Sequence, residues 1–245
     1  MERKKLILFL VFILHSFVSF ASFKEEIYYA YISNKMELWQ EVIDKINKIP
    51  DKSNETILEQ LNYCYGFVGW CLGQKKKDIA KKYLQLGNEL ITKLEQKKYK
   101  LSVIYAYKSA FIGYEIGISP YKAPFIGSKS IEYAYQSIKF DSSNYFAYIQ
   151  LGNAEYYKPA IFGGSKKEAI KYFLKALEFY NSKRNEINKD WNLLHLLATI
   201  GKIYLEINDY NNAKLYFDKA LKIEPNFHWV KNELYPLLST KIRKQ

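Results

Sequence analysis

The chain is poor in residues that interrupt helices or separate domains. Its 245 residues include only six prolines and eleven glycines. No stretch rich in proline, glycine and serine divides it, and alternating strand patterns are missing. These absences exclude a chain of linked modules and favour one all-α domain. A chain of this length suits a solenoid of five or six helical hairpins.

Cysteine is also scarce, with only Cys64 and Cys71 present. The two lie on one predicted helix, about 10 Å apart along its axis at ~1.5 Å per residue. A disulfide needs α-carbons within about 7 Å, so these two cysteines should not bridge each other. We interpret them as small buried apolar residues, with an intermolecular bond as the alternative.

Sequence patterns typical of catalysis are absent. Beyond the first 21 residues the only histidines are His195 and His228, and neither has metal-ligand spacing with cysteines or carboxylates. A nucleophile elbow, a dinucleotide fingerprint and a His-Glu-x-x-His helix are all missing. We therefore expect no enzyme, no metal site and no cofactor.

Acidic residues are outnumbered by basic ones, and the formal net charge is +12. Such a balance can indicate nucleic acid, an anionic membrane surface or an acidic protein partner. The lysines are scattered among acidic residues along the predicted helices and form no sustained basic stripe. We interpret them as solvated helix faces and expect no nucleic-acid partner.

The amino terminus has the pattern of a secretory signal peptide. A basic start of Arg3, Lys4 and Lys5 precedes an apolar run from Leu6 to Val18, and Ser19-Phe20-Ala21 fits the small-x-small cleavage rule. The apolar run is short for a membrane span of ~20 residues, so cleavage after Ala21 is preferred over an uncleaved anchor. We therefore expect an exported protein, periplasmic or secreted, without a stable membrane anchor.

The clearest internal pattern covers Leu194 to Pro225. In a 34-residue frame it places large, small and aromatic residues where two antiparallel helices would pack closely. Gly201 and Ala220 are small at the expected close approach, and Asn208-Asp209 supplies turn chemistry between the helices. The positions that carry the pattern are Leu197, Ile200, Gly201, Tyr204, Ala213, Phe217, Ala220 and Pro225.

One such hairpin cannot bury its own apolar face, so the pattern predicts further copies upstream. Weaker copies can be placed in the same frame. The predicted division is a signal peptide at 1–21, an N-terminal capping hairpin at 22–58, four repeats at about 59–96, 103–142, 145–181 and 194–226, and a short C-terminal helix with a basic tail at 227–245.

This pattern resembles that of tetratricopeptide-repeat proteins. The resemblance covers roughly Glu59 to Pro225, and a leucine stands at the fourth position in place of the usual tryptophan. It implies a right-handed superhelical solenoid of antiparallel helical hairpins. It also implies a non-enzymatic scaffold whose first helices line a concave groove that binds a ligand.

Groove-facing residues follow from the repeat frame. Aromatic groups with a few lysines and asparagines suit a peptide, or a flat apolar ligand with a polar end. The tyrosines have packing between repeats as their alternative role. The groove candidates are Tyr65, Tyr105, Lys108, Phe146, Asn153, Tyr156, Tyr157, His195 and Lys202.

Two similar insertions separate the two helices of the repeats at 103–142 and 145–181, at Tyr121–Lys129 and Tyr157–Lys167. Each contains Tyr-Lys, a proline, apolar residues, glycine and Ser-Lys. In the structural interpretation Ser165 and Glu168 form a capping box, and Ile161 and Phe162 pack against the repeat. In the functional one, glycine amides at a helix start bind an anion. The loop candidates are Pro124, Phe125, Gly127, Pro159, Phe162, Gly163 and Gly164.

These features favour an exported scaffold that binds a protein or peptide in its groove. The second insertion also resembles loops of exported tetratricopeptide proteins, among them the periplasmic component associated with some TRAP transporters. That resemblance implies an alternative, a small-molecule-binding accessory of an envelope uptake system. An envelope assembly scaffold acting through its outer face is a third hypothesis.

Overall fold

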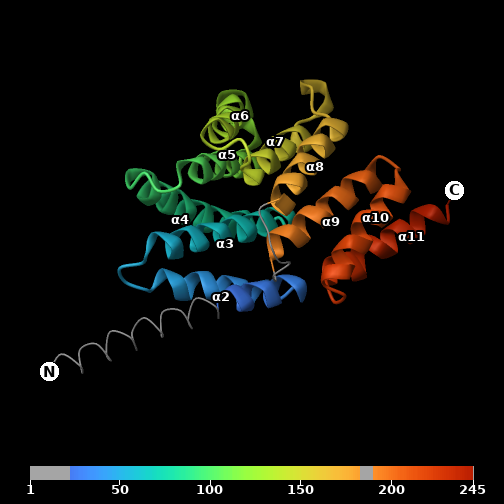
Figure 1. Ribbon diagram of the computed structural model, residues 1–245, viewed down its shortest axis with the longest axis horizontal. Helices are drawn as coiled ribbons and strands as arrows, with labels where there is room; N and C mark the ends of the chain where they lie inside the picture. The colour runs from blue at the N-terminus through green and yellow to red at the C-terminus, as the bar shows by residue number, and fades with distance from the viewer. Residues whose placement is uncertain (1–22, 183–189, 245) are drawn as a thin grey trace.

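The structure is a computed structural model that describes residues 23–182 and 190–244. The predicted signal peptide lies outside the described residues. Within them the chain is helical, with turns and short loops and no strand. Successive helices pack in antiparallel pairs, and the pairs follow one another across the molecule (Figure 1). The predicted all-α solenoid of helical hairpins is confirmed.

The first hairpin consists of helical residues 23–32 and α2 (Met36–Asn47), and we call residues 23–47 the N-terminal hairpin. A short C-terminal segment combines the π-helical turn η3 (Trp229–Leu234) with α11 (Tyr235–Ile242). Between them lie four hairpins: α3 (Asn54–Gly73) with α4 (Lys77–Gln96), α5 (Leu101–Ile118) with α6 (Ala123–Phe140), α7 (Tyr145–Tyr157) with α8 (Lys166–Ser182), and α9 (Trp191–Glu206) with α10 (Tyr210–Ile223).

The last of the four hairpins shows why the repeat pattern uses its small residues. A β-carbon built on Gly201 would lie 2.5 Å from the ring of Phe217 on α10. Only hydrogen fits at that point, so the glycine lets α9 and α10 approach. Asn208 has a φ of 64°, and the side chain of Asp209 accepts a hydrogen bond from Asn212 N at the start of α10. The predicted turn at Asn208-Asp209 is therefore confirmed.

Both cysteines lie in the core of α3. Cys64 and Cys71 are fully buried and carry free thiols. Burial raises the pKa of the Cys71 thiol to about 11, so this sulfur stays protonated and unreactive at neutral pH. The prediction that the two do not bridge each other is confirmed.

The two insertions adopt different structures, although their sequences are similar. In the first, a 3-10 turn η1 (Pro120–Lys122) leads directly into α6, which starts at Ala123. The expected loop is therefore mostly an extension of the second helix. Pro124 is tolerated because the first turn of a helix leaves its amide groups without intrahelical partners.

The second insertion stays a loop, built on the 3-10 turn η2 (Ala160–Phe162). Gly163 ends that turn with a φ of 85°, a left-handed conformation that the first insertion does not contain. The expectation that Ile161 and Phe162 pack against the repeat is wrong, because their side chains are 86% and 71% exposed. The turn directs both side chains away from the helices.

Only half of the expected capping box forms at the start of α8. Ser165 Oγ accepts a hydrogen bond from Glu168 N at 3.2 Å, as an N-cap should. The return bond is missing, since Ser165 N donates to Glu155 O and the carboxylate of Glu168 pairs with Lys171. A backbone oxygen of α7 thus accepts from the Ser165 amide, which a full capping box would have bonded to the Glu168 side chain.

The N-terminal hairpin closes the solenoid by packing against its last hairpin. Figure 1 shows the blue hairpin beside the orange and red helices. The Tyr28 hydroxyl donates to Glu224 Oε2 at 3.1 Å, and Tyr31 Oη lies 2.9 Å from His195 Nδ1. The rings of Trp39 and Trp191 meet edge to face at 4.9 Å. The two ends of the described chain are therefore joined directly.

None of the helices in the described ranges has the length and apolarity needed to cross a membrane.

Candidate functional site

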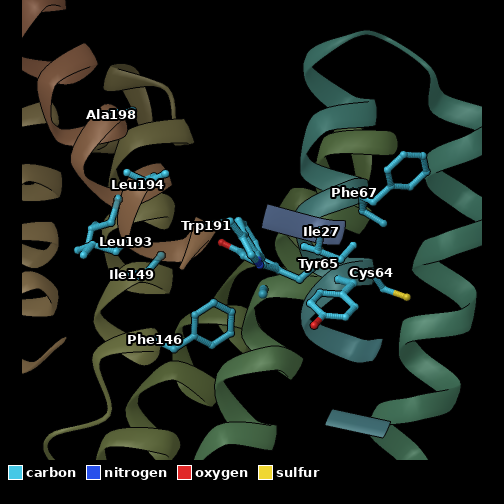
Figure 2. Close-up of a cluster of buried hydrophobic side chains, with 14 of the residues drawn as sticks. Ile27, Cys64, Tyr65, Phe67, Phe146, Ile149, Trp191, Leu193, Leu194 and Ala198 are labelled. Atoms are coloured by element: carbon cyan, nitrogen blue, oxygen red, sulfur yellow. The ribbon is translucent and has the colours of Figure 1, made fainter. Parts of the chain in front are cut away.

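The first helices of the four hairpins converge on one aromatic residue, Tyr65 of α3. Its ring lies 4.9 Å from Phe146 on α7 and 6.3 Å from Trp191 on α9. The rings of Tyr107 and Tyr114 of α5 also contact the Tyr65 ring. Figure 2 shows Trp191 between α9 and Tyr65, with Phe146 below. Because Tyr65 is only 6% exposed, the middle of the concave face is a packed core.

The N-terminal hairpin contributes to this core through Trp39. A β-carbon on Gly66 of α3 would lie 2.6 Å from the Trp39 ring and 2.7 Å from the Trp191 ring. Trp39 Nε1 donates to the backbone oxygen of Tyr63 at 2.9 Å, which satisfies its one polar group. The hairpin therefore occupies part of the concave face that an open solenoid would offer to a ligand.

Polar side chains hold the same helices in place. Asn62 of α3 donates to the Tyr107 hydroxyl at 2.9 Å and to Asn192 Oδ1 at 3.2 Å. Its own Oδ1 accepts from Trp191 Nε1 at 3.1 Å. One amide thus connects α3, α5 and α9, and partners for both ends of its side chain remove most of the cost of burying it.

A cleft remains where α7 faces α9, and we call it the α7–α9 cleft. Its enclosed volume is about 20 Å³, and one water needs roughly 10–15 Å³. A ligand group larger than water must therefore sit at the mouth or widen the cleft. The lining residues are Tyr65, Phe146, Ile149, Asn153, Phe173, Trp191, Asn192, His195, Leu196 and Thr199.

His195 lies in the wall of the cleft and stacks on Trp229 at 5.7 Å. Burial, reinforced by the charge of Lys202, lowers the pKa of His195 to about 4. The ring is therefore neutral at neutral pH. Protonation on Nε2 lets the Tyr31 hydroxyl donate to Nδ1 across the 2.9 Å contact.

A charged cluster is built around Glu206, at the end of α9. Tyr156 Oη donates to Glu206 Oε1 at 2.8 Å, and Lys166 Nζ lies 2.9 Å from Oε2. Lys202 approaches the same carboxylate at 3.8 Å and the Tyr156 ring at 5.6 Å. Burial opposes ionisation of Glu206, but the bonds from Lys166 and Tyr156 outweigh it and lower its pKa. The cluster links α7, α8 and α9.

Most groove candidates fall at the cleft or this cluster, but they do not form an open groove. Tyr65, Phe146, Asn153 and His195 line the cleft, with Tyr65 and Phe146 buried. Tyr156 and Lys202 belong to the Glu206 cluster. Tyr157 is 75% exposed, and its ring lies 4.7 Å from that of Tyr156.

Two candidates lie elsewhere, and their placement in the groove is corrected. Tyr105 stacks on Phe140 of α6 at 5.4 Å. Lys108 pairs with Glu95 of α4 at 2.6 Å and lies over the ring of Tyr133. Both therefore face the second helices. The register of the repeat at 103–142 differs from the prediction, because Tyr107 and Tyr114 take the inward positions.

The loop candidates lie on the inserted segments. Pro124, Phe125 and Gly127 belong to the first turns of α6, so they form no loop. Pro159, Phe162, Gly163 and Gly164 lie in the second insertion. A β-carbon on Gly164 would lie 1.8 Å from Lys158 O, so this glycine is required by a close backbone approach.

Several residues of the site were not among the candidates. Trp191 precedes the repeat frame by three residues, so the frame could not include it. Tyr31 and Trp39 belong to the N-terminal hairpin, whose sequence carries no repeat signature. A tryptophan three residues before a repeat was a signal in itself, since so large a side chain needs a surface to cover it.

The described residues contain no group of three or more His, Cys, Asp or Glu side chains arranged to hold a metal ion. Residues 194–227 match the tetratricopeptide repeat family, which is the segment where the sequence pattern is clearest. Repeats of this family commonly bind proteins, so the match supports a protein-interaction or scaffold role. The curated proteins contain no match to the chain.

Proposed function

We propose that this protein is an exported, non-enzymatic interaction module that binds a protein or peptide at the mouth of the α7–α9 cleft. One observation carries the proposal: the α7–α9 cleft is a hollow between two first helices, beside the aromatic core. Half-buried Asn153 of α7 and Thr199 of α9 both line the cleft, together with the aromatic side chains of Tyr65, Phe146 and Trp191.

The lining residues suggest the chemistry of the partner. The side-chain amide of Asn153 can exchange hydrogen bonds with a peptide backbone, while Trp191 and Phe146 offer apolar contact. The Glu206 cluster, with Lys166 and Lys202, adds paired charges at the end of α9. An extended segment that lies at the mouth of the cleft, with one apolar side chain against the aromatic lining and polar groups on either side, fits this arrangement.

Export is part of the proposal because of the amino-terminal sequence pattern at 1–21. The alternative function remains a small-molecule accessory of an envelope uptake system of the TRAP-associated type. That function requires the cleft to widen, since about 20 Å³ holds no more than a water molecule. A peptide needs less rearrangement, because its backbone can remain at the mouth.

A photocrosslinking experiment tests the site. A photoreactive benzoylphenylalanine replaces Thr199 at the cleft or, as the control, Leu215, which is 46% exposed on α10. Each protein is irradiated in an envelope extract and its adducts are identified by mass spectrometry. We expect one polypeptide to crosslink at position 199 and not at position 215.

A second variant links the adduct to the cleft chemistry. Asn153→Ala should remove most of the crosslink at position 199 while circular dichroism shows an unchanged helix content. An adduct that forms equally at both positions, or that survives Asn153→Ala, would rule out binding at the cleft. A small molecule attached at position 199 in place of a polypeptide would favour the uptake alternative.

A further inference from the structure

The five most exposed large apolar side chains of the described residues lie on the two inserted segments, 119–129 and 157–167. Each is more than 70% exposed, whereas the next in order, Phe140, is 58% exposed. Exposed apolar groups gathered in one region mark surfaces that contact another phase or molecule. The five are Tyr121 (72%), Phe125 (81%), Tyr157 (75%), Ile161 (86%) and Phe162 (71%).

Both segments lie at the same edge of the solenoid. They follow α5 and α7, which run side by side in the same direction. Near the starts of these helices, the rings of Tyr107 and Phe146 are 4.6 Å apart. Figure 1 shows the tip between α7 and α8 projecting beyond the helices.

The same segments are basic. They contain five lysines, Lys122, Lys129, Lys158, Lys166 and Lys167, and no carboxylate. Three of these lysines reach back to Glu115, Glu155 and Glu206 on the helices. Lys129 lies over the Tyr133 ring, and Lys167 makes no ion pair within the described part of the chain. The outer edge therefore combines apolar tips with cationic groups.

We propose that these two segments form a docking edge for an anionic lipid surface. Aromatic side chains favour the boundary between headgroups and acyl chains, and lysines beside them attract anionic headgroups. Two shallow tips give reversible, peripheral contact and no membrane span. The edge would hold the protein at a membrane while the α7–α9 cleft, a separate surface, binds its partner.

The shape of the edge favours lipid over a protein partner. The apolar side chains lie on two separate segments, on the 3-10 turns η1 and η2 and on the adjoining helix ends, and are individually exposed by 71–86%. A stable protein interface packs as tightly as a protein interior and needs a continuous complementary surface. A fluid bilayer surface needs no such match, because lipids rearrange around each tip.

Fluorescent labels on the edge test this proposal. Phe162→Cys and, as the control, Leu215→Cys each carry an environment-sensitive dye. Cys64 and Cys71 are fully buried, so the dye reacts only at the introduced thiol. The protein is purified in the form that an exporting cell releases. It is then mixed with vesicles of phosphatidylcholine alone or of phosphatidylcholine with phosphatidylglycerol.

We expect the dye at position 162 to shift to the blue with the anionic vesicles and to be quenched by nitroxide-labelled lipids. The dye at position 215 should not respond. Replacing Phe125 and Phe162 by serine should weaken vesicle binding by about tenfold or more. Replacing Lys129 and Lys167 by glutamine should weaken binding to the anionic vesicles by about tenfold.

Three results would overturn the proposal. The first is no response at position 162 to anionic vesicles. The second is an equal response at both positions, which would show adsorption of the whole molecule. The third is protection of position 162 from a soluble quencher by a lipid-free envelope protein fraction but not by vesicles. That result would assign the edge to a protein partner.

Discussion

At the residue scale, two glycines in helix interiors have opposite surroundings. A β-carbon on Gly201 would lie 2.5 Å from the Phe217 ring and 3.2 Å from Ala213 O, whereas one on Gly113 would meet nothing within 4 Å. The same substitution to alanine should therefore have opposite effects. Gly201 is held by packing, while Gly113 only adds backbone freedom to the unfolded chain.

We expect Gly201→Ala to lower the free energy of unfolding by about 1–3 kcal/mol through overpacking. Gly113→Ala should raise it by about 0.5–1 kcal/mol, because alanine favours the helix. Urea unfolding followed by circular dichroism measures both. Equal effects of the two substitutions would contradict the close packing of α9 on α10.

His195 should give stability a distinct dependence on pH. Its pKa in the folded protein is about 4, below the ordinary 6.5, because the ring is buried. Above pH 6.5 the ring is neutral in both states. Between pH 6.5 and 4 only the unfolded chain takes up the proton, so this group's contribution to stability falls as the pH falls through that window.

The expected loss over that window is about 3 kcal/mol at most, taken from the difference between the two pKa values. His195→Gln removes the titrating group, so the comparison isolates it from the carboxylates that also titrate in acid. Unfolding of both proteins is measured from pH 7 to pH 4. Parallel curves would show that the ring is accessible to water.

At the element scale, the start of α8 separates two contributions that a capping box would combine. Ser165 Oγ caps the helix, but Glu168 does not return the bond. We expect Ser165→Ala to destabilise the protein by about 1 kcal/mol. Glu168→Ala should change stability by only a few tenths of a kcal/mol, since its partner Lys171 is exposed. Thermal unfolding distinguishes this outcome from two equal losses.

Periodicity predicted the helices well, because each second helix must bury one stripe against its partner. It predicted the fourth and fifth hairpins best, where Gly152 and Gly201 sit under the rings of Phe173 and Phe217. The repeat at 103–142 has Ala134 in the corresponding core, so no aromatic side chain defined the register. That is why Tyr105 and Lys108 were assigned to the wrong face.

The insertions show a similar limit. Matching motifs predicted matching loops, yet one glycine with a positive φ separates the two outcomes. Gly163 ends a turn, whereas Gly127 continues a helix. In the sequence, the two insertions differ at this point: the second has the pair Gly163-Gly164, whereas the first has the single glycine Gly127. The effect of the pair depends on Lys158 O, which leaves no room for a side chain at position 164.

At the scale of the whole molecule, closure makes distant hairpins interdependent. In an open solenoid each repeat contacts only its neighbours. Here Trp39 of the first hairpin meets Trp191 of the last at 4.9 Å. Destabilising one end should therefore weaken the other.

A double-mutant cycle tests this. Trp39→Leu and Trp191→Leu should be non-additive, with a coupling of about 0.5–1.5 kcal/mol in the free energy of unfolding. Trp39→Leu with Phe111→Leu, whose ring contacts are with Tyr107 and Tyr114, is the control pair and should be additive within about 0.5 kcal/mol. Additivity in both pairs would mean that the ends are not joined in solution.

The contact between the N-terminal hairpin and the last hairpin could not be predicted from the sequence, for a physical reason. Tyr31 and His195 are separated by 164 residues, and neither residue type indicates its partner. Repeat periodicity describes contacts between adjacent helices and carries no information on how far the solenoid curves. The repeat frame therefore placed Tyr65 and Phe146 in a ligand-binding groove, whereas the structure buries both in the centre of the concave face.

The contact between the two ends also has a consequence during translation, because the N-terminal hairpin cannot complete its packing until α9 has been synthesised. A ribosome adds about 5–20 residues per second, so the 164 residues between Tyr31 and its partner His195 take on the order of ten seconds to appear. During that interval Trp39 of the N-terminal hairpin has been synthesised, but Trp191 and the rest of α9, which cover it in the folded protein, have not. A holdase chaperone that binds the N-terminal hairpin and releases it only after α9 has emerged would protect the chain from aggregation.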